Sequence, residues 1–350
     1  YQFINDELQK IESKVNDIFF FFRANKLAFS KQKFLEQFEA KKDEINSNFD
    51  FFDCFEEYLT SGSLIKSYNT IKAQRTIKNY LKTFEEETGF VITFDKLNDL
   101  FYEELMKYSF FEKEIKNNYF AKIIAVLKSF VRWSIDKNYT TNRDFEKFKG
   151  IEHDVDIIYL TYDELIKLYK HDFENSRLNH VKDFYCMGCF TGLRFSDLSQ
   201  LHRANITETH INISIQKTKT QNHIISLNKF SKEILDKYRG TIYEPLPKIS
   251  QQKFNDYIKD CCEIIELDKP TTITWFIGTK KVQNTVPKHQ LITSHTARKT
   301  FITNSLLLGM EPKAIKKIAN IKKDAVLDKY MKITEEYTNQ QMDKWNNHEK

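Results

Sequence analysis

The spacing of apolar residues predicts a mainly helical chain with one small β-sheet. In the segment 77–84 apolar residues recur every three or four positions, the spacing of one buried helix face, and Gly89 follows where that helix can end. The segment 120–131 repeats this pattern. Between 209 and 227 isoleucines alternate with polar residues, the run KTKTQN interrupts, and an apolar run resumes, which predicts a β-hairpin with a basic tip. From 251 to the end we expect helices again.

These patterns, and the polar stretches between them, divide the chain into successive segments. We expect a helical linker over 1–47, a helical bundle over 48–145, a linker over 146–157 and a second domain with a C-terminal tail over 158–350. A length of 350 residues exceeds the usual size of one hydrophobic core, which agrees with this division. Thr161 and Glu164 form a capping-box pattern that predicts a helix at the start of the second domain. The chain begins with Tyr1 rather than Met, so we expect a further segment ahead of it.

Charge alone does not identify a partner. The chain has 54 Lys and Arg against 49 Asp and Glu, a formal net charge of +5, which is too small to indicate a nucleic acid. Basic residues nevertheless lie on the polar side of both predicted bundle helices, where they could contact phosphates without reading sequence. They are Lys72, Arg75, Lys78, Lys82, Lys122, Lys128 and Arg132. For any one of them, a solvated surface position is the simpler interpretation.

The five cysteines predict reduced thiols in a cytoplasmic protein. Cys186 and Cys189 form a C-x-x-C, but they lie in the apolar run FYCMGCF and no second ligand pair with zinc-site spacing follows. We therefore interpret them as buried thiols, with a metal or redox role as the alternative. The sequence has no signal peptide and no apolar run near the roughly 20 residues of a membrane-spanning helix, so we expect no membrane partner.

Four short motifs in the second domain carry side chains suited to phosphodiester chemistry. They are TGLRFSDL with Arg194, QKTKT with Lys219, SHTARKTF with His295 and Arg298, and LDKYMKI with Tyr330. A tyrosine oxygen can form a covalent intermediate that keeps the energy of the broken bond. Two guanidinium groups can stabilise the charge that develops on the phosphate oxygens, because their planar donors match those oxygens in pairs. Each residue alone is common, so the signal lies in their order and settings.

Local signals place two of these motifs, those of Arg194 and of His295 with Arg298, at the ends of helices. Gly192 can end one helix just before Arg194, and Ser196 and Asp197 can cap the next one. The Thr–Ser pair before His295 can likewise cap a helix, which puts that histidine and the arginine three residues later on one face.

With these motifs, nearly the whole chain resembles the tyrosine recombinase (phage integrase) family, most closely the integrases of Bacteroidetes-type mobile elements. The resemblance implies a helical core-binding domain and a mixed α/β catalytic domain that form a C-shaped DNA clamp, with the segment 1–47 connecting to an arm-binding domain. It implies a site-specific recombinase that integrates or excises a mobile element through a 3′-phosphotyrosyl intermediate. The implied partners are double-stranded DNA, three further copies in a tetramer on DNA, and accessory DNA-bending or directionality factors. No metal, nucleotide or organic cofactor is implied.

The resemblance also implies a role for each site residue. Tyr330 is the nucleophile, Arg194 and Arg298 clamp the phosphate, His295 transfers a proton or binds phosphate, Lys219 protonates the leaving 5′ oxygen, and Asp197 supports the site. Lys217 is the alternative to Lys219 and Tyr337 the alternative to Tyr330. The tail after about 338 is a candidate for docking on a neighbouring copy.

One position departs from the family. Nine residues before the nucleophile the family usually has histidine, sometimes tryptophan, preceded by glycine, whereas this chain has Asn320 and Ile321. Either the other cationic groups suffice, or activity is lowered, or Lys322 or Lys323 replaces the missing donor. If the pocket is otherwise intact, we expect a histidine at 321 to speed cleavage. A type IB topoisomerase, a catalytically weakened DNA-binding relative and a plain helical interaction protein remain as alternatives.

Overall fold

The computed structural model describes residues 49–215 and 220–333, with scattered positions between 12 and 35 and Met342. Most of the predicted linker 1–47 and the tail after 338 lie outside the described residues, as do Lys217, Lys219 and Tyr337. The chain forms two compact units, one of Tyr1–Asp154 with Trp275–Val282 and one of Val155–Thr274 with Gln283–Lys350. In the part of the chain that is described, no helix is long and apolar enough to cross a membrane.

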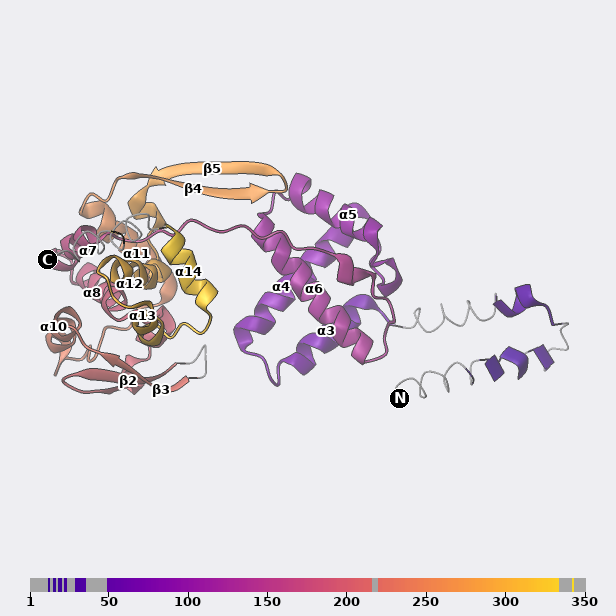
Figure 1. Ribbon diagram of the computed structural model, residues 1–350, viewed down its shortest axis with the longest axis horizontal. Helices are drawn as coiled ribbons and strands as arrows, with labels where there is room; N and C mark the ends of the chain where they lie inside the picture. Colours follow the sequence, from indigo (N-terminus) through magenta and orange to yellow (C-terminus); the bar gives the residue numbers. More distant parts are fainter. Residues whose placement is uncertain are drawn as a thin grey trace. The chain divides into compact units, whose positions relative to one another are not determined.

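The first unit is helical, with local signals that explain where its main helices begin and end. Its elements are α3 (Phe51–Gly62), α4 (Tyr68–Thr88), the short helix η1 (Phe94–Lys96), α5 (Asp99–Lys107), the π-helical turn η2 (Tyr108–Glu112), α6 (Asn117–Asp136) and η3 (Asp144–Lys147) (Figure 1). Asp50 caps α3 by accepting hydrogen bonds from the first turn, and Ser67 caps α4. Gly89 ends α4 with a φ of 71°, as predicted. The predicted apolar faces of α4 and α6 are buried together with aromatic rings of α3, such as Phe55.

The second unit is mostly helical and contains a three-stranded sheet and the outer ends of the hairpin β4–β5, whose tip, Trp275–Val282, belongs to the first unit. Its helices are α7 (Tyr162–Lys170), α8 (Ser176–Thr191), α9 (Phe195–Leu198), η4 (Leu201–Arg203), α10 (Lys229–Tyr238), α11 (Gln251–Ile264), η5 (Lys288–Leu291), α12 (Ser294–Leu307), α13 (Pro312–Ile318) and α14 (Asp324–Ile333). The strands are β1 (Asn205–Ile206), β2 (His210–Ile215), β3 (Thr220–Ser226), β4 (Pro270–Ile277) and β5 (Lys280–Pro287). The order β1-β2-β3 is antiparallel, which confirms the predicted hairpin strands. The predicted capping box of Thr161 and Glu164 begins α7.

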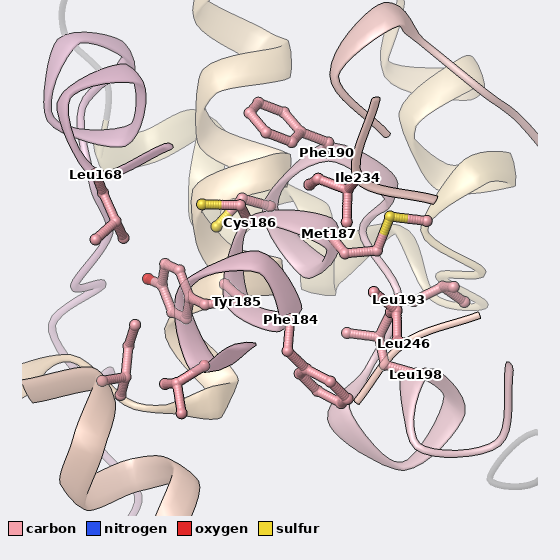
Figure 2. Close-up of a cluster of buried hydrophobic side chains, with 14 of the residues drawn as sticks. Leu168, Phe184, Tyr185, Cys186, Met187, Phe190, Leu193, Leu198, Ile234 and Leu246 are labelled. Atoms are coloured by element: carbon pink, nitrogen blue, oxygen red, sulfur yellow. The ribbon is translucent and has the colours of Figure 1, made fainter. Parts of the chain in front are cut away.

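Helix α8 forms the centre of the second unit. All its residues from Val181 to Thr191 are buried, and α7, α10, α11 and α12 pack around it. Figure 2 shows this core, with Tyr185, Cys186 and Met187 of α8 among side chains of neighbouring elements. Burial raises the pKa of the Cys186 and Cys189 thiols, which therefore stay protonated. Among the described residues no group of three potential metal ligands is found.

The hairpin β4–β5 corrects the prediction that only helices follow residue 251. Its first strand contains TTITWFI, in which β-branched and aromatic residues favour a strand, and Gly278 stands at the turn with a φ of 57°. The tip of this hairpin belongs to the helical unit. The side-chain amide of Asn117, at the start of α6, donates to the Gly278 carbonyl at 2.9 Å and accepts from the Gly278 N–H at 2.7 Å.

Candidate active site

Arg194 is positioned by the turn that ends α8. Gly192 takes a φ of 69°, and a Cβ there would lie 2.6 Å from Cδ1 of Phe301, so only glycine fits. Arg194 is itself the N-cap residue of α9, and Ser196 and Asp197 lie inside that helix. The prediction that Ser196 and Asp197 cap it was therefore wrong. The short helix instead places Asp197 one turn after Arg194.

Arg298 meets Arg194 at the same turn. It lies on α12 with only 7% of its surface exposed, and its Nη1 donates to the carbonyl of Gly192 at 2.7 Å. Burial, and to a smaller extent the charge of Arg194, lower the pKa of Arg298 to about 10, against the opposing effects of Tyr330 and Asp197. The guanidinium stays charged at neutral pH. Four of the predicted site residues therefore lie near one another at α12: Arg194, Asp197, Arg298 and Tyr330.

Asp197 and Arg194 carry buried polar atoms that lack hydrogen-bond partners among the described residues. These atoms are both carboxylate oxygens of Asp197 and Nη1 of Arg194, which lies 4.0 Å from Oδ2 of Asp197. Burial raises the pKa of Asp197, and the charges of Arg194, Arg298 and His223 counteract that rise. An uncompensated polar atom is costly to bury, so this cluster is arranged for an additional charged group rather than for stability. An anion at this place can accept a hydrogen bond from Nη1 of Arg194.

Tyr330 enters the site from α14. Figure 1 shows α14 and α13 beside α12, and the ring of Tyr330 is buried in one apolar cluster with Phe301 and Leu327. Burial raises the pKa of the Tyr330 phenol and the positive charge of Arg298 lowers it. The phenol is thus protonated at neutral pH and lies near a cation that stabilises its anionic form.

Helix α12 is held on several sides, which fixes Arg298. The hydroxyls of Tyr185 and Thr296 are 2.9 Å apart, and Thr300 accepts from the Leu160 N–H at 3.0 Å. At its start, the Ser294 N–H donates to the side chain of Asn255 at 2.8 Å. Thr293 is the N-cap residue, one of the two predicted. His295, in the first turn, is exposed.

Ile321 is not turned toward solvent. It is 7% exposed and packs in the apolar cluster that contains Tyr330, whereas Lys322 and Lys323 are exposed. The residue before it, Asn320, has a φ of 47°, which explains how asparagine stands where the family usually has glycine. The position is filled by apolar packing, which argues against the expectation that a histidine there would speed cleavage.

His223 is a site residue that the sequence analysis missed. It lies on β3 opposite Ile213 of β2, is 8% exposed, and is close enough to Asp197 to affect that carboxyl's pKa. Its Nε2 lies 2.8 Å from the carbonyl oxygen of Ile318. The available signal was a histidine two residues before Ile225, which places both side chains on the same, inward face of β3.

The predicted phosphate contacts of the helical unit differ in accessibility. Lys72, Arg75, Lys82, Lys122 and Arg132 are exposed, although Arg75 pairs with Glu56 at 2.8 Å and Lys82 lies over the Phe52 ring. Lys128 donates to the Glu146 carbonyl at 2.8 Å. Lys78 is buried and bound to Glu56, so it does not belong to the solvent-facing set in which it was predicted.

Comparisons with known proteins show what this arrangement is similar to. No protein-family model matches the chain, and no curated protein sequence matches it either. Among solved structures, the Tn1549 transposon integrase in complex with transposon right end DNA has a TM-score of 0.61 and 13% identity over 84% of this chain and 99% of that one. A lambda integrase dimer bound to a COC' core site has a TM-score of 0.58 and 16% identity over 81% and 95% of the two chains. At these identities the likeness is one of fold, and this chain has the mainly helical fold, with small sheets, of the tyrosine recombinases.

Proposed function

We propose that this chain is a DNA strand transferase, a site-specific tyrosine recombinase that integrates or excises a mobile element. The observation that carries the proposal is the placement of Arg194, Asp197 and Tyr330 around the buried Arg298 of α12. Two forked cations beside a phenol suit attack on a phosphodiester, because the charge gained in the transition state falls on oxygens that the cations can bind. The fold supports this reading, since similar structures are those of integrases bound to DNA.

In the first step, the Tyr330 oxygen attacks the scissile phosphorus and the bond from phosphorus to the 5′ oxygen breaks. The phenolic proton leaves to a base, for which His295 is the candidate, and the 5′ oxygen takes a proton from Lys219. A 3′-phosphotyrosyl link and a free 5′-hydroxyl result. The 5′-hydroxyl of a partner strand then attacks the link and releases Tyr330. Arg194 and Arg298 stabilise both transition states.

Exchange between two duplexes requires four active sites, so the functional form in this proposal is a tetramer on double-stranded DNA. A lambda integrase tetramer bound to a Holliday junction is one of the similar structures, with a TM-score of 0.59. The bond energy stays in the phosphotyrosyl link, so the reaction as proposed consumes no nucleotide. The proposal includes that the mobile elements on which the enzyme acts are of the Bacteroidetes type.

Trapping the covalent intermediate tests the proposal. In a candidate core site with a nick just beyond the scissile phosphate, cleavage frees a short fragment that carries the new 5′-hydroxyl. This fragment diffuses away, so religation fails and a denaturation-resistant protein–DNA adduct accumulates. Tyr330→Phe should keep the fold and DNA binding but form no adduct, while the matched variant Tyr337→Phe should behave as the unchanged protein. Adduct formation by Tyr330→Phe would assign the nucleophile to another residue.

The phosphate clamp has a separate test. Arg194→Ala or Arg298→Ala should slow cleavage about 10²-fold or more, the scale for losing one transition-state donor. Near-normal rates in both variants would refute the clamp.

The general acid is tested with a substrate that does not need one. Lys219→Ala should cleave ordinary DNA poorly, because an alkoxide leaves poorly without a proton. It should cleave well when sulfur replaces the bridging 5′ oxygen. Lys217→Ala is the matched control, and equal defects of Lys219→Ala on both substrates would rule out proton donation by that lysine.

A catalytically weakened DNA-binding relative is the second candidate. The packing of Ile321 favours it, since this apolar residue occupies the position of a phosphate ligand of the family. Such a protein would bind the site specifically yet give no adduct with the nicked substrate.

A further inference from the structure

A pocket of about 450 Å³ lies in the second unit, where the first turns of α8, the loop after α10 and helix α11 meet. Its walls are largely aromatic. The rings of His180 and Tyr243 pack with their centroids 4.4 Å apart, and the ring of Tyr257 on α11 forms another wall. We call this space the α8–α11 pocket.

The charges in the α8–α11 pocket are unbalanced. Arg177, Lys248 and Lys253 line it, and none of the described residues around it is acidic. Neither lysine pairs with an acidic residue in the described part of the chain, and Arg177 donates to the neutral hydroxyl of Tyr257 at 3.0 Å. Three like charges that share a pocket repel one another, so a bound anion would be attracted by all of them.

The acidic residue that acts on His180 does not neutralise these cations. Asp183 is 2% exposed and already accepts from Lys237 Nζ at 2.6 Å and from the Tyr238 hydroxyl at 2.7 Å. Burial lowers the pKa of His180, so its ring is neutral at neutral pH and serves as a wall. The charge of the pocket is therefore that of its three cations.

The guanidinium of Arg177 is oriented before any ligand binds. It lies over the Tyr257 ring, 5.3 Å from the centroid, while one of its N–H groups donates to the hydroxyl of that tyrosine. The remaining N–H groups of a guanidinium form a planar fork that matches phosphate oxygens in pairs. A phosphate group is thus the anion that suits this pocket.

Helix α11 connects the pocket to the helix of the buried arginine in the candidate active site. Gln251 Nε2 donates to the hydroxyl of Ser294, the first residue of α12, and the Ser294 N–H donates to Asn255. Lys253 and Tyr257 each follow one of these α11 contacts by two residues, about 200° around the helix. The pocket therefore lies on the opposite side of α11 from α12.

We propose that the α8–α11 pocket binds a backbone phosphate of the DNA substrate beyond the phosphodiester that is cleaved. This inference rests on the proposed function. A helix is about 10 Å across and a DNA strand has one phosphate for about every 3.4 Å of its axis, so the bound phosphate lies roughly three to six nucleotides from the cut. The cations Arg177, Lys248 and Lys253 are exposed and come from three elements, which suits a phosphate on a large polymer better than an enclosed free ion.

Neutral methylphosphonates, placed one at a time in the candidate core site, test this inference. With the unchanged protein, one position at that distance from the cut should weaken binding about threefold to tenfold. The double variant Arg177→Gln/Lys253→Gln should bind unmodified DNA more weakly by a similar factor. The methylphosphonate at that position should then cost little more, because the phosphate and the two cations form one interaction.

Lys167→Gln is the matched control, since this exposed lysine of α7 lies outside the pocket and its loss also removes one positive charge. It should keep the full methylphosphonate penalty. A double variant that keeps this penalty, or that binds unmodified DNA as tightly as the unchanged protein, would overturn the inference.

Tyr257→Phe tests the orientation of Arg177 separately. It removes the hydroxyl that accepts from the guanidinium and keeps the ring. We expect weaker binding at the same phosphate with an unchanged Tm, and no added effect of Tyr257→Phe in an Arg177→Gln background. An equal effect in both backgrounds would show that the hydroxyl does not act through Arg177.

Two measurements identify the source of a failure. Isothermal titration of the DNA-free protein with inorganic phosphate should give no saturable binding, and binding that the double variant loses would assign the pocket to a free anion instead of DNA. Covalent adduct formation on the nicked site reports the proposed function. An unchanged protein that forms the adduct without a phosphate position that depends on the pocket would refute this inference alone, whereas the absence of an adduct would refute the proposed function.

Discussion

Replacing Ile321 with histidine would introduce the residue usual at this position in the tyrosine recombinases that the chain resembles, and the packing of Ile321 opposes the faster cleavage that the sequence suggests. The side chain of Ile321 is 7% exposed and shares an apolar cluster with Phe301, Leu327 and Tyr330. Loss of the buried isoleucine surface costs about 2 kcal/mol. Burial of an imidazole without a bonded partner adds about 1–3 kcal/mol. We therefore expect Ile321→His to destabilise the second unit by about 3–5 kcal/mol.

Thermal unfolding followed by circular dichroism measures this loss. For a unit of this size each kcal/mol lowers Tm by about 2–4 °C, so Ile321→His should melt about 10 °C below the unchanged protein. Ile321→Val is the matched control, because it removes one methylene group and should cost about 0.5–1.5 kcal/mol. The cluster includes Tyr330, so the histidine variant should also form the covalent adduct more slowly than the valine variant.

Faster cleavage by Ile321→His, without a loss of stability, would refute this reasoning. A histidine that reached the phosphate would add a charge-assisted hydrogen bond of about 1.5–3 kcal/mol, which corresponds to about 10- to 100-fold faster cleavage. If Ile321→His melts like the unchanged protein and cleaves faster, the side chain at 321 turns toward the DNA. The packing argument would then be wrong.

Three further predictions concern other parts of the chain. Gly192→Ala should unfold at lower temperature and lose cleavage, because a methyl group at this left-handed position meets a ring of α12 and displaces the carbonyl that orients the second arginine. Asn117→Ala should destabilise the helical unit by about 1–3 kcal/mol in urea unfolding, because it leaves the N–H and carbonyl of Gly278 without their partner; an unchanged midpoint would show that the hairpin tip is not held there. Lys72→Ala and Lys122→Ala should each reduce the slope of log affinity against log salt concentration by about 1, if these exposed lysines contact phosphates.

Sequence was sufficient for features that depend on neighbours along the chain. Gly89 and Gly192 end helices because the left-handed turn that follows a helix favours glycine. The alternating isoleucines of β2 face the core as predicted, because side chains alternate along any strand. The buried C-x-x-C of α8 followed from its apolar surroundings. The motifs with Arg194, Arg298 and Tyr330 were recognised in the sequence from their order and settings, and their roles stay predictions.

Only the tertiary structure decided which of these side chains meet, because contacts between distant segments leave no local period. Lys78 has the spacing of a surface residue, yet its side chain is buried and forms an ion pair with the partly exposed Glu56 of another helix. The strand β4 was overlooked among predicted helices, and its tip joins a unit that begins more than a hundred residues earlier in the chain. The packing of Ile321 beside the Tyr330 cluster, and the contact of His223 with Ile318, exist only after α12, α13 and β3 have come together, so no reading of the sequence alone could assign them.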